Sequence, residues 1–145
     1  MKTKKAGCIL LNVELKSIGL VYREQYNDFS FPKGHVEEGE DIITAAIRET
    51  EEETKRKVKI LDKYEPYVEE YKTPRGEDCI CYMYIGLDNG VSDNDSLDTH
   101  PFYWIKIEDV KNKLSYQSLK DMWDKVKNNV LQEMKNKNKG ENYEK

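Results

Sequence analysis

Residues 34–53, GHVEEGEDIITAAIRETEEE, decide the fold that this sequence can form. A loop with two glycines leads into a predicted helix that carries Glu49, Glu52 and Glu53. At about 100° per residue, the second and third carboxylates lie about 60° and 40° to either side of the first, so all three converge. Like charges at these spacings destabilise a helix by roughly 0.2–0.5 kcal/mol per pair, and a divalent cation offsets that repulsion. Carboxylate oxygens favour magnesium, manganese or calcium over zinc.

The charged residues and the first glycine of this stretch match the Nudix box, G-x5-E-x7-R-E-U-x-E-E-x-G-U, where U is a bulky aliphatic residue. The matching residues are Gly34, Glu40, Arg48, Glu49, Glu52 and Glu53. The sequence therefore resembles the Nudix (MutT-like) hydrolase family, which cleaves a diphosphate bond in a nucleoside diphosphate linked to another group. The resemblance implies an α/β fold, an α/β/α sandwich with a mixed β-sheet.

Three residues depart from the box. Thr50 and Arg56 stand where an aliphatic residue is usual, and Lys55 replaces the second glycine. A glycine after a helix adopts left-handed geometry, which costs a lysine on the order of 1 kcal/mol. Because Lys55, Arg56 and Lys57 are good helix formers, we expect the helix to continue past Lys55 by about a turn.

Phosphoanhydride hydrolysis needs a positioned water, a base for its proton, and neutralisation of charge on the phosphoryl oxygens. Glu49, Glu52 and Glu53 are the predicted ligands of Mg²⁺, with Mn²⁺ as an alternative. Either Glu52 or Glu49 is the candidate general base. The resemblance implies that Arg48 orients one of these carboxylates. It also implies that Glu40 and Gly34 support the metal site.

Residues 32–37, PKGHVE, and the later RETEEE are similar to the diadenosine tetraphosphate hydrolase branch of the family. That similarity implies that Lys33 and His35 contact a polyphosphate. It also offers Tyr82 as a stacking partner for a base, although a tyrosine in an apolar strand more often only packs.

The same branch has a lysine just before the strand that starts near residue 79, where this chain has two acidic residues. Arg75 can supply the missing charge. Alternatively, a carboxylate outside the box becomes an additional metal ligand, the candidates being Glu77, Asp78 and Asp98.

The composition of the 145 residues predicts a small intracellular protein. A net charge of −4 and a pI near 5.4 argue against extended nucleic acid as a partner, and no apolar run is long enough for a membrane span. We expect one Nudix domain over residues 1–134 and a polar, disordered tail over 135–145. Cytoplasmic location, a small nucleotide substrate and a monomer or homodimer are the matching expectations. Cys8, Cys79 and Cys81 are interpreted as reduced core residues.

Apolar periodicity predicts the remaining elements. Strands are expected over residues 6–13, 18–22, 58–71, 79–87 and 102–107, with an extended piece at 29–32, an acidic loop at 88–98 and a last helix after Ser115. In the box helix, Ile43, Ala46, Ile47 and Thr50 should face the sheet.

Two alternatives remain at this level. In the first, the same reaction cleaves another substrate, namely a nucleoside triphosphate, ADP-ribose or capped RNA. In the second, the chain is not an enzyme but a non-catalytic nucleotide-sensing Nudix module. The complete set of box carboxylates favours an enzyme, because a pure binding module has no need to keep them together.

Overall fold

The computed structural model describes residues 2–93 and 100–140, with backbone alone for 137–140. Within these residues, eight strands form one mixed sheet. They are β1 (Thr3–Asn12), β2 (Ser17–Arg23), β3 (Asp28–Ser30), β4 (Lys33–His35), β5 (Arg56–Ile60), β6 (Tyr67–Lys72), β7 (Asp78–Val91) and β8 (Phe102–Lys106). The helices are α1 (Ile42–Thr54), the 3-10 turn η1 (Ile107–Asp109), α2 (Val110–Lys113) and α3 (Gln117–Gly140).

The strand β1 organises the sheet. It runs parallel to β7 over its whole length, and it pairs antiparallel with β2 at one end and with the short strand β4 at the other. Its side chains are buried on both faces, as expected for a central strand that is covered by helices on both sides. Because β4 pairs with β1 and is followed by the loop into α1, the β1 register fixes where the box begins.

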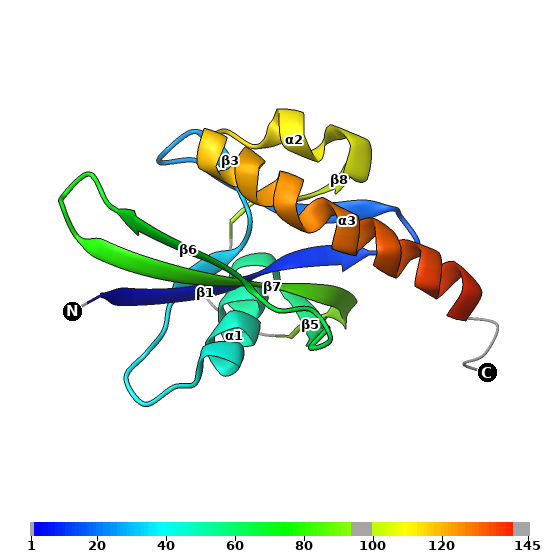
Figure 1. Cartoon of the computed structure of the whole chain (residues 1–145), viewed down its shortest axis with the longest axis horizontal. Coiled ribbons are helices and arrows are strands. Elements are labelled where there is room, and N and C mark those ends of the chain that lie inside the picture. The colour runs from blue at the N-terminus through cyan, green and yellow to red at the C-terminus, as the bar shows by residue number, and fades with distance from the viewer. Residues whose placement is uncertain (1, 94–99, 141–145) are drawn as a thin grey trace.

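Helices cover both faces of the sheet, so the predicted α/β/α sandwich is confirmed (Figure 1). One apolar cluster packs α3 onto the sheet through the side chains of its inner face, Leu119, Met122, Trp123, Val126 and Val130. A smaller cluster lies under α1 and is formed by Ala6, Cys8, Ala45, Ala46 and Tyr84. The hairpin of β6 and β7 projects beyond the layers, beside the N-terminus (Figure 1).

The helix α1 begins at Ile42 and is capped by Asp41, whose carboxylate accepts from the Thr44 backbone N–H at 3.4 Å and from its hydroxyl at 2.7 Å. Of the predicted inner face, Ala46 and Thr50 are buried as expected, but Ile43 is 40% exposed and Ile42 packs on the cluster under α1 instead. The buried stripe therefore continues along the turns that carry Glu49 and Glu53. This rotation brings these two acids towards the sheet.

The predicted extension of α1 past Lys55 is wrong. Lys55 adopts left-handed geometry, with φ 59° and ψ 31°, and its N–H donates to the Glu51 carbonyl. The strand β5 starts at the next residue, where Arg56 pairs with Val91 and its guanidinium makes two hydrogen bonds to Asp88 at 2.8 and 2.7 Å. These strand and ion-pair contacts offset a strain of about 1 kcal/mol.

Three further predictions need correction. The single strand predicted over 58–71 is two strands, β5 and β6, separated by a turn where the Tyr64 N–H donates to the Leu61 carbonyl. The predicted acidic loop at 88–98 begins later, because β7 continues to Val91 by pairing with β5. The helix α3 continues to Gly140, past the start of the predicted tail.

The three cysteines are buried free thiols, as predicted. Burial raises the pKa of Cys8 to about 12, so its thiol stays protonated at neutral pH. None of the helices within the described residues combines the length and the apolar character needed to cross a membrane.

Candidate active site

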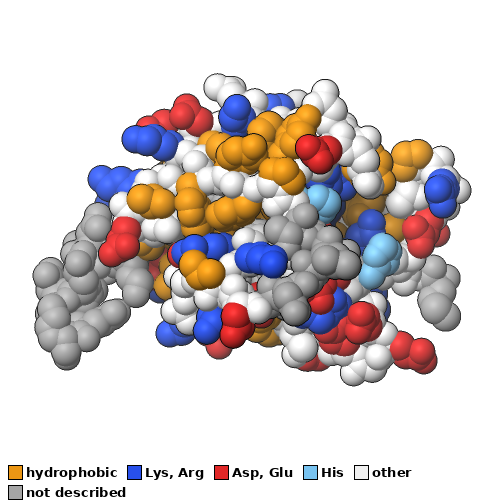
Figure 2. All heavy atoms as spheres, turned by 180° about the vertical axis from the view of Figure 1, so that it is seen from behind, with side chains coloured by type: hydrophobic (Ala, Val, Ile, Leu, Met, Phe, Trp, Pro, Cys, Tyr) orange, Lys and Arg blue, Asp and Glu red, His pale blue; other side chains and the backbone are white. Residues whose placement is uncertain are grey.

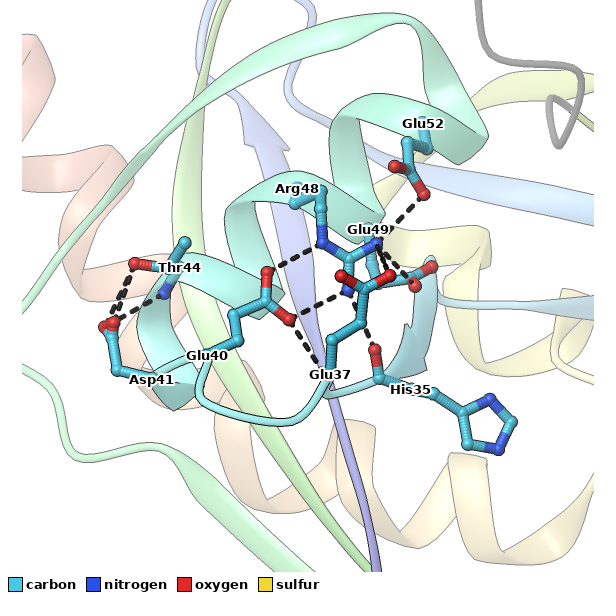
Figure 3. A network of polar contacts seen from close by, with 8 residues as sticks. All are labelled: His35, Glu37, Glu40, Asp41, Thr44, Arg48, Glu49 and Glu52. Atoms are coloured by element: carbon cyan, nitrogen blue, oxygen red, sulfur yellow. Dashed lines mark hydrogen bonds and ion pairs between the residues drawn. The ribbon is translucent and has the colours of Figure 1, made fainter.

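Arg48 is the centre of a polar network between α1 and the loop before it (Figure 3). Its guanidinium makes two hydrogen bonds to Glu40, at 2.7 and 3.0 Å, and one to the His35 carbonyl at 2.9 Å. It also contacts Glu49 at 3.0 Å and Glu52 at 3.2 Å. The guanidinium of Arg48 and the Glu37 backbone N–H lower the pKa of Glu40 to about 2. One arginine thus holds three box carboxylates and ties the helix to the glycine loop.

Gly34 lies directly against the Glu49 carboxylate. A Cβ at residue 34 would stand 2.0 Å from a Glu49 oxygen, which no side chain can do without displacing that carboxylate. Its partner in the β1–β4 pairing is Ala6, so the position of Gly34 is set by the sheet. The first glycine of the box therefore creates the space that Glu49 occupies.

Glu53 is the most buried of the three acids, with 14% of its side chain exposed. Burial, and to a lesser extent the nearby Glu49, raises its pKa to about 8. The Lys33 backbone N–H, which donates to Glu53 at 3.1 Å, and the cations Arg23 and Lys33 act in the opposite direction. Two carboxylates are thus held near one another in a site that disfavours their charge.

Glu49 and Glu53 form the acidic wall of a cavity of about 490 Å³. Both histidines of the chain line it as well, and Figure 2 shows the histidine side chains on one face, among basic and acidic groups. The full lining is Lys5, Arg23, Gln25, Tyr26, Ser30, Phe31, Lys33, Gly34, His35, Glu49, Glu53 and His100. A cavity with carboxylates beside several cations suits a metal-bound polyanion.

Three cations, Lys5, Arg23 and Lys33, form the basic wall of the same cavity. Arg23 is fixed by the buried Asp28 through contacts of 2.8 and 2.6 Å, and its guanidinium lies 4.6 Å from the centre of the Tyr26 ring. The two lysines are positioned differently, by the Tyr71 ring, with ammonium-to-centroid distances of 5.8 Å for Lys5 and 5.6 Å for Lys33.

The residues present fit a divalent cation. The space at Gly34 accommodates the Glu49 carboxylate, and Glu49 and Glu53 reach the same cavity, where a cation would relieve their repulsion. In the part of the chain that the structure describes, no three His, Cys, Asp or Glu side chains already form a metal-binding group. Glu52 contacts Arg48 and is not part of the cavity lining.

The comparison with protein families decides the assignment. The model of the Nudix domain matches residues 1–127. The chain belongs to the Nudix family. It is a Nudix hydrolase, and enzymes of this family generally use divalent metals.

Solved structures of Nudix proteins share the fold. A binary complex of the Ap4A hydrolase from C. elegans is 24% identical, with a TM-score of 0.75, and the match covers 89% of this chain and 98% of that one. A MutT protein from Bacillus halodurans is 18% identical, with a TM-score of 0.64 and coverage of 84% and 80%. A Nudix-family hydrolase from Clostridium perfringens is 15% identical, with a TM-score of 0.68 and coverage of 84% and 93%. No curated protein sequence matches the chain.

Several predicted residues of this Nudix domain lie outside the cavity lining. Tyr82 packs on the cluster under α1, on the opposite face of the sheet from Cys81, and Arg75 lies in the exposed turn of the β6–β7 hairpin. The acids near that turn are engaged elsewhere, because Glu77 accepts from the Thr3 hydroxyl and Asp78 pairs with Lys72 at 2.6 Å. The remaining candidate ligand, Asp98, is outside the described residues.

Sequence reasoning missed seven residues that line the cavity, namely Lys5, Arg23, Gln25, Tyr26, Ser30, Phe31 and His100. The His100 backbone N–H donates to the Glu53 carbonyl at 3.1 Å, and its ring lies 3.9 Å from the Glu53 carboxylate. Of these residues, Arg23 could have been suspected from the sequence, because it follows a predicted strand and starts the loop that leads towards the box. Lys5 and His100 reach the site only through tertiary pairing.

Proposed function

We propose that this Nudix hydrolase uses Mg²⁺, or Mn²⁺, to cleave a phosphoanhydride bond of a dinucleoside polyphosphate, with diadenosine tetraphosphate as the preferred substrate. One observation carries the proposal: carboxylates from α1 and cations from β1, β2 and β4 line a single cavity. A polyphosphate needs cations along its length and a divalent ion at the bond that breaks.

The protein supplies ligands, orientation and a base. Glu49 and Glu53 would hold the metal ion in the cavity, and Glu52, which contacts Arg48, is the third proposed ligand. Glu40 stays with Arg48 and fixes the guanidinium, while Gly34 keeps Glu49 in place. When bound, the divalent ion neutralises phosphoryl charge and lowers the pKa of water.

Of the two candidate bases, we favour Glu49 over Glu52. Glu49 lines the cavity and also accepts from Arg48, so its carboxylate is both accessible and oriented. A general base must come within hydrogen-bond reach of the water whose proton it takes. His35 and Lys33, which line the cavity beside it, are the proposed contacts for the phosphates.

The choice of substrate rests on the PKGHVE stretch at 32–37 and on the likeness to the C. elegans Ap4A hydrolase. The cavity adds support, because Tyr26 at its edge is 57% exposed and already stacks on a guanidinium, so a base can stack there as well. This assigns the stacking role to Tyr26 in place of Tyr82. Cytoplasmic location remains part of the proposal, since dinucleoside polyphosphates are intracellular compounds.

The test is hydrolysis of a substrate panel with Mg²⁺ and with a chelator, followed by separation of the nucleotide products. The panel contains diadenosine tetraphosphate, ADP-ribose, a nucleoside triphosphate and a capped RNA end. We expect the tetraphosphate to have the highest kcat/KM, and Glu49→Gln to lose roughly 10²–10⁴-fold in kcat. Preference for another compound would contradict the proposed substrate, and metal-independent turnover would contradict the proposed mechanism.

A further inference from the structure

Lys5 and Lys33 are cavity cations that carry no ion pair. Among the described residues, neither ammonium has a carboxylate oxygen within the 4.0 Å that defines a salt bridge. Arg23, in contrast, is paired with Asp28, and Arg48 is paired with the box glutamates. Lys33 interacts with Glu53 and Glu69 only at longer range, so an anion that enters the cavity meets two lysines without breaking a salt bridge.

The two ammonium groups lie at the same ring. Both are within 6 Å of the Tyr71 centroid, the range of a cation–π contact, and the ring is held by the β6–β7 pairing of Tyr71 with Cys79. Two half-buried cations beside one ring repel each other. An anionic group between them would relieve the repulsion, which makes this end of the cavity a place for phosphate.

The sheet register places Lys5 beyond Lys33. Lys33 touches both parts of the cavity, because its backbone N–H donates to Glu53 while its ammonium lies over Tyr71. Lys5 lies opposite Cys81 of β7 and opposite His35 of β4, next to that ring. A chain of phosphates that starts at the glutamates and follows Lys33 reaches Lys5 only when it is long enough.

We propose that Lys5 is a specificity-determining residue that selects substrates by the length of their phosphate chain. It binds phosphate groups remote from the bond that breaks, so it favours substrates with four phosphates over those with two. This inference rests on the proposed function for the position of the reacting phosphate. Binding of a free phosphate chain by the lysine pair is independent of it.

The decisive variant is Lys5→Met, which keeps most of the aliphatic stem over Tyr71 and removes the charge. We expect KM for diadenosine tetraphosphate to rise about tenfold, as for loss of one charge-assisted contact, with kcat within about twofold of the parent. KM for ADP-ribose, with two phosphates, should stay unchanged. Lys5→Arg should restore most of the tetraphosphate KM.

Lys4→Met is the matched control, because Lys4 is the exposed neighbour whose side chain points to the other face of β1. It should leave both KM values unchanged. If Lys5→Met does not fold, Lys5→Gln replaces it. An equal KM for the tetraphosphate in parent and variant would overturn the role of Lys5, and so would an equal rise for both substrates.

Calorimetry with inorganic tripolyphosphate separates this inference from the proposed function. The parent should bind tripolyphosphate, and Lys5→Met should bind it about tenfold more weakly. If the parent hydrolyses no compound of the panel but this difference persists, the proposed function fails and the anion site stands. If the parent hydrolyses the tetraphosphate and the two proteins bind tripolyphosphate equally, only the role of Lys5 fails.

Discussion

The two walls of the cavity are built in different ways. The acidic wall is fixed at both of its groups: Arg48 and the space at Gly34 hold Glu49, and the Lys33 backbone N–H holds Glu53. The basic wall contains one anchored cation, Arg23, and two lysines that are placed by an aromatic ring. We infer from this difference that the acidic wall, the proposed place of the reaction, is rigid. The basic wall, which is proposed to bind the phosphate chain, can adjust to its ligand.

The largest effect should come from Glu53→Gln, on the acidic wall. The amide keeps the shape but removes a buried carboxylate that is a proposed ligand of the divalent ion, so we expect kcat to fall roughly 10²–10⁴-fold, with KM changed far less. Steady-state kinetics with Mg²⁺ measure this. Circular dichroism serves as the control for folding, and a variant that turns over at the parent rate would remove Glu53 from the acidic wall.

Gly34→Ala should have the next largest effect. Its Cβ would meet the Glu49 oxygens at 2.0 and 2.6 Å, so the carboxylate must move. A displacement of about 1 Å at a catalytic group costs on the order of 10²-fold in rate. Gly76→Ala, in the hairpin turn, is the control for kcat, because a Cβ there meets open space and its only cost is backbone strain at φ 85°, outside the cavity lining. Equal kcat values for Gly34→Ala and the parent would mean that Glu49 does not need its present position.

The pH dependence of stability tests the burial of Glu53 in the acidic wall. Because Glu53 has a pKa of about 8 in the folded protein and 4.5 as its ordinary value, the folded state binds more protons between these limits. The free energy of unfolding should therefore fall as pH rises from about 4.5 to about 8, by on the order of 5 kcal/mol. Urea unfolding of the parent and Glu53→Gln, each without metal, measures the difference.

Addition of Mg²⁺ should abolish this loss in the parent, because the ion binds the ionised carboxylates of the folded state. In Glu53→Gln, both the loss of stability with rising pH and its recovery with Mg²⁺ should be smaller than in the parent. A parent whose stability does not differ from that of the variant across this pH range would contradict the burial of Glu53 as the cause.

Arg48→Lys should have a smaller effect, since the charge stays. A lysine cannot reproduce the paired contacts to Glu40 together with those to Glu49 and Glu52. We expect kcat to drop about tenfold and the free energy of unfolding to drop by about 1–2 kcal/mol. Parallel kinetics and denaturant titrations check both. A variant with unchanged kcat would show that Arg48 does not orient the carboxylates.

The acidic wall was predictable from sequence and the basic wall was not. Gly34, Glu40 and Arg48 interact within one short segment, so their spacing along the chain already encodes their geometry. Lys5 and Lys33 meet at Tyr71 only because β1, β4, β6 and β7 pair in one register. No local pattern specifies such long-range pairing.

The wrong predictions around α1 have local causes. Apolar spacing alone fits Ile43 and Ile42 about equally well as the inner residue, and the small side chains Ala45 and Ala46 decide for Ile42 because they let the helix approach the sheet. Helix propensity likewise favoured an extension beyond Lys55, but pairing of β5 with β7 overrides it.

Lys55→Gly should have the smallest effect and should leave both walls untouched. Glycine adopts the observed φ of 59° without strain, and relief of that strain should raise the free energy of unfolding by about 0.5–1 kcal/mol. The larger conformational entropy of glycine in the unfolded chain reduces this gain. Lys57→Gly, inside β5, is the matched control and should destabilise the protein by about 0.5–1 kcal/mol. The kinetic constants of Lys55→Gly should equal those of the parent, because Lys55 lies at the end of α1 and outside the cavity lining. A loss of stability in Lys55→Gly would mean that contacts of the lysine side chain, and not relief of backbone strain, decide how α1 ends.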